Sequence, residues 1–394
     1  MNEPLPQLPW YRPRLEYVAY LGWTWFALIT AGRVLFRVDG WNGVYTEFHS
    51  AALGWANGYD IYLPGLEFRY PPIIAALLVP FSKLGEVWGS VLWRWMNIAI
   101  YLGSLVWAFR ALFPAELGRI ARASILLLLI PLSITSLNNA QVNGMLVGLL
   151  IGASIALREQ RYRLAAFLAM GPVALKLYPI VFAMVAGLLY PRRFIAWFVM
   201  FVGLAAVLPF ACAETEYVAN QYWQLYYAIV RDDRTGDITR AYRDLRLVFA
   251  HAGMPMSDHA YQAIQVLAGA GIAAIAWLGQ RRGWSRDRLL GYALALVCCW
   301  MTLLGPATEK ATYIFLAPVL VWLLVEAKRE GWRSRFRMLL VIYLLYLVPV
   351  VIQGSAIRSA PVRVALPLAT IPLFGYVALR AIRDLRDPRT TTSA

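Results

Sequence analysis

Residues 122–158 read RASILLLLIPLSITSLNNAQVNGMLVGLLIGASIALR. Two apolar runs, at 123–136 and 141–157, flank a polar tip, and an arginine closes each outer end of the stretch. Apolar runs of this kind are typical of helices in a lipid bilayer. Because Lys and Arg concentrate on the cytoplasmic side of membranes, the two arginines place both ends of this hairpin on one face. The polar tip then lies on the other face, outside the cytoplasm.

The composition of the whole chain also indicates lipid as its solvent. The 394 residues are 60% hydrophobic and 15% charged, whereas soluble domains are roughly 45–50% apolar and about 25% charged. The 16 Trp, 22 Tyr and 17 Phe exclude a disordered chain. Three cysteines in so long a chain exclude a disulfide scaffold.

Further apolar runs predict an all-α polytopic membrane protein of about 12 transmembrane helices, with both termini in the cytoplasm. The stretch 163–192 is broken at Gly171-Pro172 and again at 176–179, so we expect two shorter helices there. We expect 1–394 to form a single integral membrane domain. The remaining predicted spans are 17–37, 88–109, 194–212, 262–279, 288–305, 311–327, 337–353 and 362–380.

Two long segments, 38–87 and 213–261, are left on the outer face. Loops of this length are usually functional, and we expect them to cover an active site with short juxtamembrane helices. Within the first loop, 70–84 is apolar but short, and we interpret it as interfacial or re-entrant.

The net charge of +15 could indicate nucleic acid or a membrane as partner. Most of the excess lies in the short turns predicted to be cytoplasmic, so it is an orientation signal. Nucleic acid is thereby excluded as a partner, and membrane lipids are expected.

Lys176 is one of only four lysines, and it lies at membrane depth beside a predicted helix break. A desolvated ammonium there needs an anion. Two interpretations stay open: a pair with Glu309, or a phosphate held by Lys176 and by the free N–H groups of the following half-helix.

Carboxylates in the first loop and cations at the helix tips suit transfer from a phosphorylated donor. One group would take a proton from the acceptor hydroxyl while others stabilise the leaving phosphate. The chain has no glycine-rich nucleotide loop, which disfavours ATP or a nucleotide sugar. No histidine pair has metal-ligand spacing, so we expect no metal and no cofactor.

Four motifs in order resemble glycosyltransferase family 87, over roughly residues 17–325. This family contains polyprenyl-phosphate-mannose-dependent mannosyltransferases of the GT-C superfamily. The first motif is Phe48–Ala52 with Asn57–Tyr62 and Phe68–Pro72; the others are Ala140–Asn143, Leu175–Pro179 and Gly305–Glu309.

The resemblance implies a GT-C fold, an extracytoplasmic active site, a lipid-phosphate sugar donor, and a carboxylate base after the first span that gives inversion. The family's usual aspartate aligns with Val44. The acids available are Glu47, one helical turn later, and Asp39, five residues earlier. We expect Glu47 ahead of Asp39, and the alternative stays open.

We therefore expect transfer of a hexose, mannose by the resemblance, from a polyprenyl-phosphate sugar donor to a lipid or glycan acceptor, outside a bacterial cell (inner) membrane. The predicted catalytic residues are Glu47 and Asp39. The predicted donor phosphate ligands are Lys176, Arg94, Arg240 and Arg243. The predicted sugar or acceptor ligands are Asn138, Gln141, Asn143, Tyr178, Asp60, Tyr62, Glu309 and Lys310.

Two other classes compete with this prediction. A polytopic transporter or lipid flippase would also place charges and broken helices at membrane depth, although the polar groups here collect on one face. A catalytically inactive family member is the other, because the usual aspartate is missing.

Overall fold

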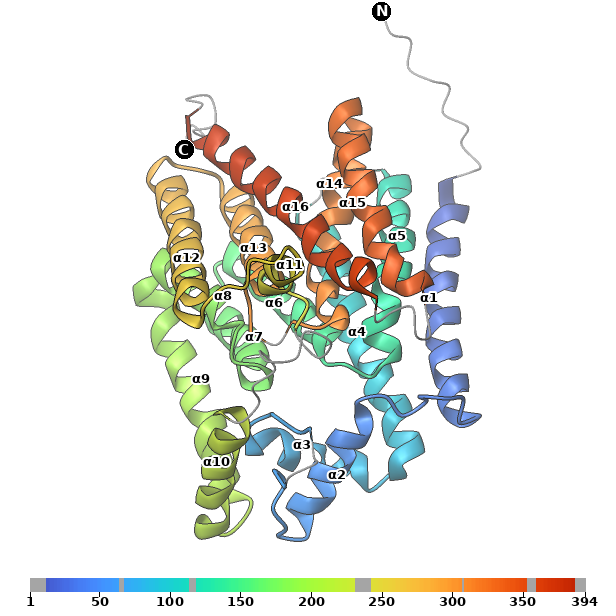
Figure 1. Cartoon of the computed structure of the whole chain (residues 1–394), viewed down its shortest axis with the longest axis vertical. Coiled ribbons are helices and arrows are strands. Elements are labelled where there is room, and N and C mark those ends of the chain that lie inside the picture. Colours follow the sequence, from blue (N-terminus) through green and yellow to red (C-terminus); the bar gives the residue numbers. More distant parts are fainter. Residues whose placement is uncertain are drawn as a thin grey trace, which may run out of the picture.

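The computed structural model describes residues 12–63, 67–112, 118–230, 242–306, 308–352 and 359–386. Throughout these ranges the regular elements are helices and none is a strand, which confirms the all-α prediction (Figure 1). The helices are α1 (Arg12–Leu35), α2 (Tyr45–Ala56), α3 (Pro72–Ser82), α4 (Gly85–Leu112), α5 (Arg119–Asn138), α6 (Asn143–Arg158), α7 (Tyr162–Leu175), α8 (Ile180–Leu189), η1 (Pro191–Ile195), α9 (Ala196–Val207), η2 (Leu208–Ala211), α10 (Thr215–Val230), α11 (Leu245–His251), α12 (Asp258–Arg281), α13 (Arg286–Leu303), η3 (Lys310–Phe315), α14 (Ala317–Arg329), α15 (Arg333–Val351) and α16 (Ala360–Arg386).

The hairpin predicted from residues 122–158 is formed by α5 and α6, with 139–142 as its tip. Helix α6 lies inside the molecule, and 14 of its 16 residues are buried. Gly148 allows this burial, because a Cβ at that position would come within 2.9 Å of the Ile100 carbonyl oxygen in α4. The central helix is therefore surrounded by protein rather than by lipid.

Six helices in the described part of the chain are long and apolar enough to cross a membrane: α1, α5, η1 with α9 and η2, α12, α15 and α16. The bent pair α3 and α4 raises this to seven if it counts as one span. The prediction of about 12 spans is therefore not confirmed. Helices α6, α7 and α8 have 16, 14 and 10 residues, and at about 1.5 Å per residue they fall short of a bilayer core of about 30 Å.

The segment 70–84 forms α3, an 11-residue helix that meets α4 at 115°. Because of this bend, α3 lies across the end of α4 instead of extending it. Helices α2, α3 and α10 gather at the lower end in Figure 1, whereas the beginning of α1 and the end of α16 lie toward the upper end. The short helices expected in the two long loops are thus present.

The two long loops, 38–87 and 213–261, contact each other in their described parts. The Ile61 N–H donates to Gln221 Oε1 of α10 at 3.1 Å, and the Tyr217 hydroxyl donates to the Tyr59 carbonyl at 2.8 Å. The rings of Trp55 and Tyr217 lie 5.3 Å apart. These contacts fix the loop after α2 against α10.

A buried arginine holds the hairpin tip to the first outer loop. Arg94 of α4 is 1% exposed, and its Nε and Nη2 donate to the Asn138 carbonyl at 3.1 and 3.0 Å. Nη2 also donates to the Trp41 carbonyl at 2.6 Å, and Nη1 donates to the Ser90 carbonyl and hydroxyl. All five N–H donors of the guanidinium are thus used within the protein.

The loop and the tip are also in direct contact beside Arg94. The Val44 N–H donates to the Asn139 carbonyl at 3.0 Å. Gly43 has φ +53°, and a Cβ there would come within 2.6 Å of the same oxygen. Only glycine suits this position. A residue with a side chain would be strained at this positive φ, and its Cβ would clash with the Asn139 carbonyl.

We predict that Arg94→Met lowers the free energy of unfolding by about 2–4 kcal/mol, because it leaves buried carbonyls of two segments without donors. Arg94→Lys should also destabilise, since an ammonium has three donors rather than a planar fork of five. Chemical denaturation in detergent micelles measures the change. Arg110→Met, at the exposed end of the same helix, is the matched control. Equal stability of the Arg94 and Arg110 variants would contradict the clamp, by which we mean the hydrogen bonds from Arg94 to the Asn138 and Trp41 carbonyls.

Candidate functional site

Lys176 lies in the predicted break, between the end of α7 at Leu175 and the start of α8 at Ile180. Its backbone is extended, with φ −147° and ψ 133°, and Pro179 precedes α8. The Nζ donates to Oδ1 of Asn143 at 3.1 Å and lies 5.9 Å from the centre of the Tyr178 ring. Three of the predicted ligands therefore meet at one point.

The ammonium of Lys176 contacts an amide oxygen and not a carboxylate. Among the described residues no ion pair joins it to Glu309, the partner that the sequence left open. Burial lowers the pKa of Lys176 to about 8, and the negative charge of Glu309 opposes this shift. Glu309 is thus near enough to influence Lys176 without binding it.

Glu309 stands just before η3 and is solvent-exposed, between buried Thr308 and half-buried Lys310. Its Oε2 accepts a hydrogen bond from Nε2 of buried Gln141 at 3.4 Å. Burial raises the pKa of Tyr70, and the charges of Glu309 and Glu47 raise it further. Tyr70 therefore lies near two carboxylates that are far apart in the sequence.

Two more cations surround Glu309. Burial lowers the pKa of Lys310, the positive charge of Arg243 lowers it further, and Glu309 opposes both. The backbone of Arg243 is fixed by its N–H, which donates to the Thr308 carbonyl at 2.7 Å, and by the Tyr313 hydroxyl, which donates to its carbonyl at 2.6 Å. The Nη1 of Arg243 is buried and has no hydrogen-bond partner among the described residues.

We call this group the polar centre. It consists of Glu47, Tyr70, Gln141, Asn143, Lys176, Tyr178, Arg243, Glu309 and Lys310.

Three buried polar atoms of the polar centre have no hydrogen-bond partner in the described part of the chain: Asn143 Nδ2, Tyr178 Oη and Arg243 Nη1. Such atoms are uncommon in folded proteins, because each costs the free energy of its lost hydration. All three can donate hydrogen bonds. A ligand rich in oxygen atoms would satisfy them.

The two candidate bases have different surroundings. Glu47, in the first turn of α2, is half-buried, and its Oε2 accepts from the Glu67 N–H at 2.9 Å. Its charge reaches Tyr70 and hence the polar centre. Asp39 is exposed in the turn after α1, where its backbone carbonyl accepts from Arg33. Of the two carboxylates, that of Glu47 is the one that acts electrostatically on Tyr70.

Other predicted residues lie outside the polar centre. All the N–H donors of Arg94 bind oxygens of the protein itself, and the carbonyl of Asn138 is one of their acceptors. The Tyr62 hydroxyl donates to the Tyr70 carbonyl at 2.6 Å, and Asp60 Oδ1 accepts from the Tyr62 N–H at 2.9 Å, so both side chains stabilise the conformation of the first loop. Arg240 lies outside the described residues.

Sequence reasoning missed Tyr70 and Arg363. Arg363 is 5% exposed near the start of α16, and its charge lowers the pKa of Arg243 in addition to the effect of burial. A charge at the end of a predicted span was the available signal. Nothing in the sequence distinguished Tyr70 from the other tyrosines of the loop.

Within the described ranges no group of three or more His, Cys, Asp or Glu is placed to hold a metal ion. The polar centre instead combines cations, amides and two carboxylates. That set of groups can bind an anion beside a polar, hydroxyl-bearing molecule.

Comparison with known families gives one match. The profile described as glycosyltransferase family 87 matches residues 68–306, more than half of the chain. The matched part contains Tyr70, the hairpin tip and Lys176, whereas Glu47 precedes it and Glu309 follows it. None of the curated proteins compared matches the chain.

We predict that Lys176 is acylated with an apparent pKa of about 8, measured as the pH dependence of its labelling rate by mass spectrometry. Glu309→Gln should lower this value, because the glutamate charge stabilises the ammonium. Glu330→Gln, an exposed position after α14, should leave it unchanged. If the apparent pKa of Lys176 is the same in Glu309→Gln as in the wild type, Glu309 does not lie close enough to Lys176 to affect it.

Proposed function

Because the chain belongs to glycosyltransferase family 87, we propose that it transfers a hexose, mannose, from a polyprenyl-phosphate sugar to a hydroxyl group of a lipid or glycan acceptor. Family membership supports glycosyl transfer, and several long apolar helices indicate a membrane protein. The donor, the sugar and the acceptor class are the proposed part.

The observation that carries the proposal is the contact of Lys176 with Asn143 beside three buried donors that have no hydrogen-bond partner among the residues the structure describes. A phosphate monoester or diester offers the oxygens and the charge that these groups lack. Lys176, Arg243 and Lys310 would neutralise that charge. The Asn143 amide and the Tyr178 hydroxyl would orient the phosphate or the sugar next to it.

In this proposal Glu47 acts as the general base. Its carboxylate takes the proton of the acceptor hydroxyl, whose oxygen attacks the anomeric carbon from the side opposite the phosphate. The bond between that carbon and the phosphate oxygen breaks, and both electrons leave with polyprenyl phosphate. The attack inverts the configuration at the anomeric carbon, and the cations stabilise the charge that develops on the leaving group.

We place this reaction on the extracytoplasmic face of a bacterial cell membrane. Helix α6 begins at Asn143 in the polar centre and ends at Arg158, and α7 runs back from Tyr162 to Leu175, next to Lys176. The arginine-rich turn between these helices is therefore at the opposite end from the polar centre. The preference of arginine for the cytoplasm supports an outward-facing polar centre.

We predict that Glu47→Gln lowers kcat by about 100-fold or more, since it removes the proton acceptor but keeps the shape of the side chain. Asp39→Asn should stay within about threefold of the wild type, because its carboxylate is away from the polar centre. Turnover of polyprenyl-phosphate mannose by purified protein measures both. Full activity of Glu47→Gln would reject Glu47 as the base, and inactivity of the wild type with this donor would reject the donor.

The pH dependence tests the role of Lys176. With a pKa of about 8, Lys176 is charged below that pH and neutral above it, so kcat/KM for the donor should fall about tenfold per pH unit above about 8. Lys176→Arg should move this fall to higher pH, because a guanidinium stays charged. An identical profile in Lys176→Arg would show that another group titrates.

A further inference from the structure

Two adjoining cavities lie at the end of α6, α7 and α8 that is remote from the polar centre. Their volumes are about 420 and 580 Å³, and they share Tyr162, Arg192 and Arg193. Cavities of this size are typical of sites for small molecules. The cationic lining residues are Arg161, Arg163, Arg192, Arg193 and Arg286, and no carboxylate of the described ranges lines either cavity.

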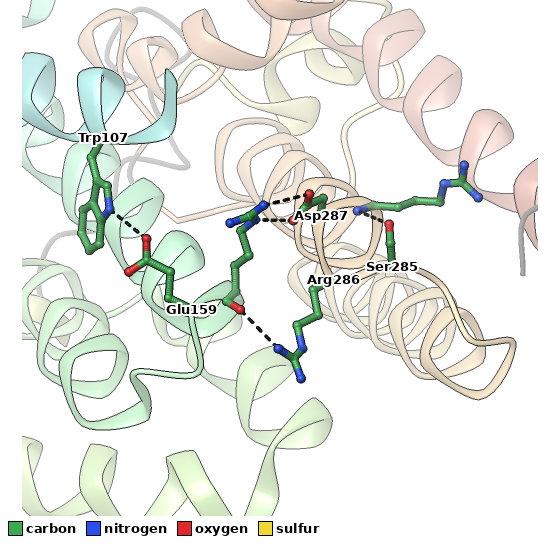
Figure 2. Close-up of polar contacts among 7 residues, drawn as sticks. Trp107, Glu159, Ser285, Arg286 and Asp287 are labelled. Atoms are coloured by element: carbon green, nitrogen blue, oxygen red, sulfur yellow. Dashed lines mark hydrogen bonds and ion pairs between the residues drawn. The ribbon is translucent and has the colours of Figure 1, made fainter. Parts of the chain in front are cut away.

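Two carboxylates near the cavities, Glu159 and Asp287, are already paired with arginines, and one of these arginines is the lining residue Arg161. Glu159 accepts from the Trp107 indole at 3.2 Å and lies 3.6 Å from Arg161. Asp287 pairs with Arg158, whose carbonyl accepts from Arg286 at 3.5 Å (Figure 2). This network joins the α6–α7 turn to the start of α13 and leaves Arg192 and Arg193 without an acidic partner among the described residues.

The cavities adjoin the least buried span of the protein. The segment Pro191–Ala211 is 21 residues long, and only 11% of the residues in its 18-residue apolar window are buried; α9 within it has no buried residue. Its surface must therefore be covered by lipid tails. Arg192 and Arg193 lie at its first turn, at the level where the headgroups of those lipids would lie.

Aromatic rings hold the arginines in place. The Arg163 guanidinium lies 4.2 Å from the centre of the Trp197 ring, and Arg193 lies over Tyr162, to whose hydroxyl it donates at 3.3 Å. Trp and Tyr are enriched at the membrane interface. A basic pocket between helices at that depth is a recognised arrangement for anionic headgroups.

We propose that these two cavities bind the phosphate headgroup of an anionic glycerophospholipid whose tails cover α9. The site is separate from the polar centre and does not depend on the transferase reaction. The shared chemistry is a phosphate ester, and the lipid source is favoured over a free phosphate because the site adjoins a lipid-covered span.

The test is a titration of the full-length protein in neutral detergent with phosphatidylglycerol, followed by native mass spectrometry. The wild type should bind phosphatidylglycerol at least about tenfold more tightly than phosphatidylcholine. Arg192→Gln with Arg193→Gln should weaken phosphatidylglycerol binding by about tenfold or more, from the loss of two charges near the headgroup. Arg329→Gln with Arg333→Gln, two exposed arginines around the α14–α15 turn, should stay within about twofold.

Three results would overturn the proposal. The first is equal binding of the two lipids by the wild type, which needs no variant. The second is equal loss in both double variants, which would mean general attraction to basic turns. The third is displacement of the lipid by millimolar glycerol phosphate or inorganic phosphate, which would identify a free phosphate as the ligand. Thermal unfolding of each variant verifies that it is folded.

Discussion

The guanidinium of Arg94 is buried without a carboxylate partner among the described residues, and it is stabilised by backbone oxygens and by the Ser90 hydroxyl. Asn138 ends α5, so its carbonyl belongs to the negative end of a helix dipole and has no partner within the helix. Arg94 supplies that partner and, with the same nitrogen, holds the Trp41 carbonyl of the first outer loop. This single side chain thus sets where α2, which carries Glu47, lies relative to the tip that carries Gln141 and Asn143. The polar centre depends on that placement.

The fold could be predicted from sequence where hydrophobic pattern alone decides it. The hairpin of α5 and α6 follows from two apolar runs, a polar tip and two arginines, and the break at Lys176 follows from its charge and from Pro179. The number of spans could not be predicted in the same way. An apolar helix surrounded by protein, such as α6, has the same pattern as one surrounded by lipid, and the bend between α3 and α4 depends on tertiary contacts.

The site was predictable to the extent that charge at membrane depth reveals it. The sequence identified four residues that the structure brings together: Lys176, Asn143, Gln141 and Glu309. They were identified because burying a polar group at membrane depth costs free energy, so such groups usually have a function. Arg94 shows the limit of this reasoning, since the sequence shows a charge but not the carbonyls that receive its donors. Tyr70 and Arg363 were missed, because an aromatic loop residue and a charge at the end of an apolar run have many ordinary roles.

The central claim is that the polar centre holds the phosphate of a lipid-linked sugar beside Glu47. The most direct test is an experimental structure of the protein with a non-hydrolysable polyprenyl-phosphate mannose analogue. The account predicts the phosphate within hydrogen-bond distance of Lys176 Nζ and the sugar on the side of Glu47 and Glu309. A phosphate bound away from Lys176, Arg243 and Lys310 would contradict it.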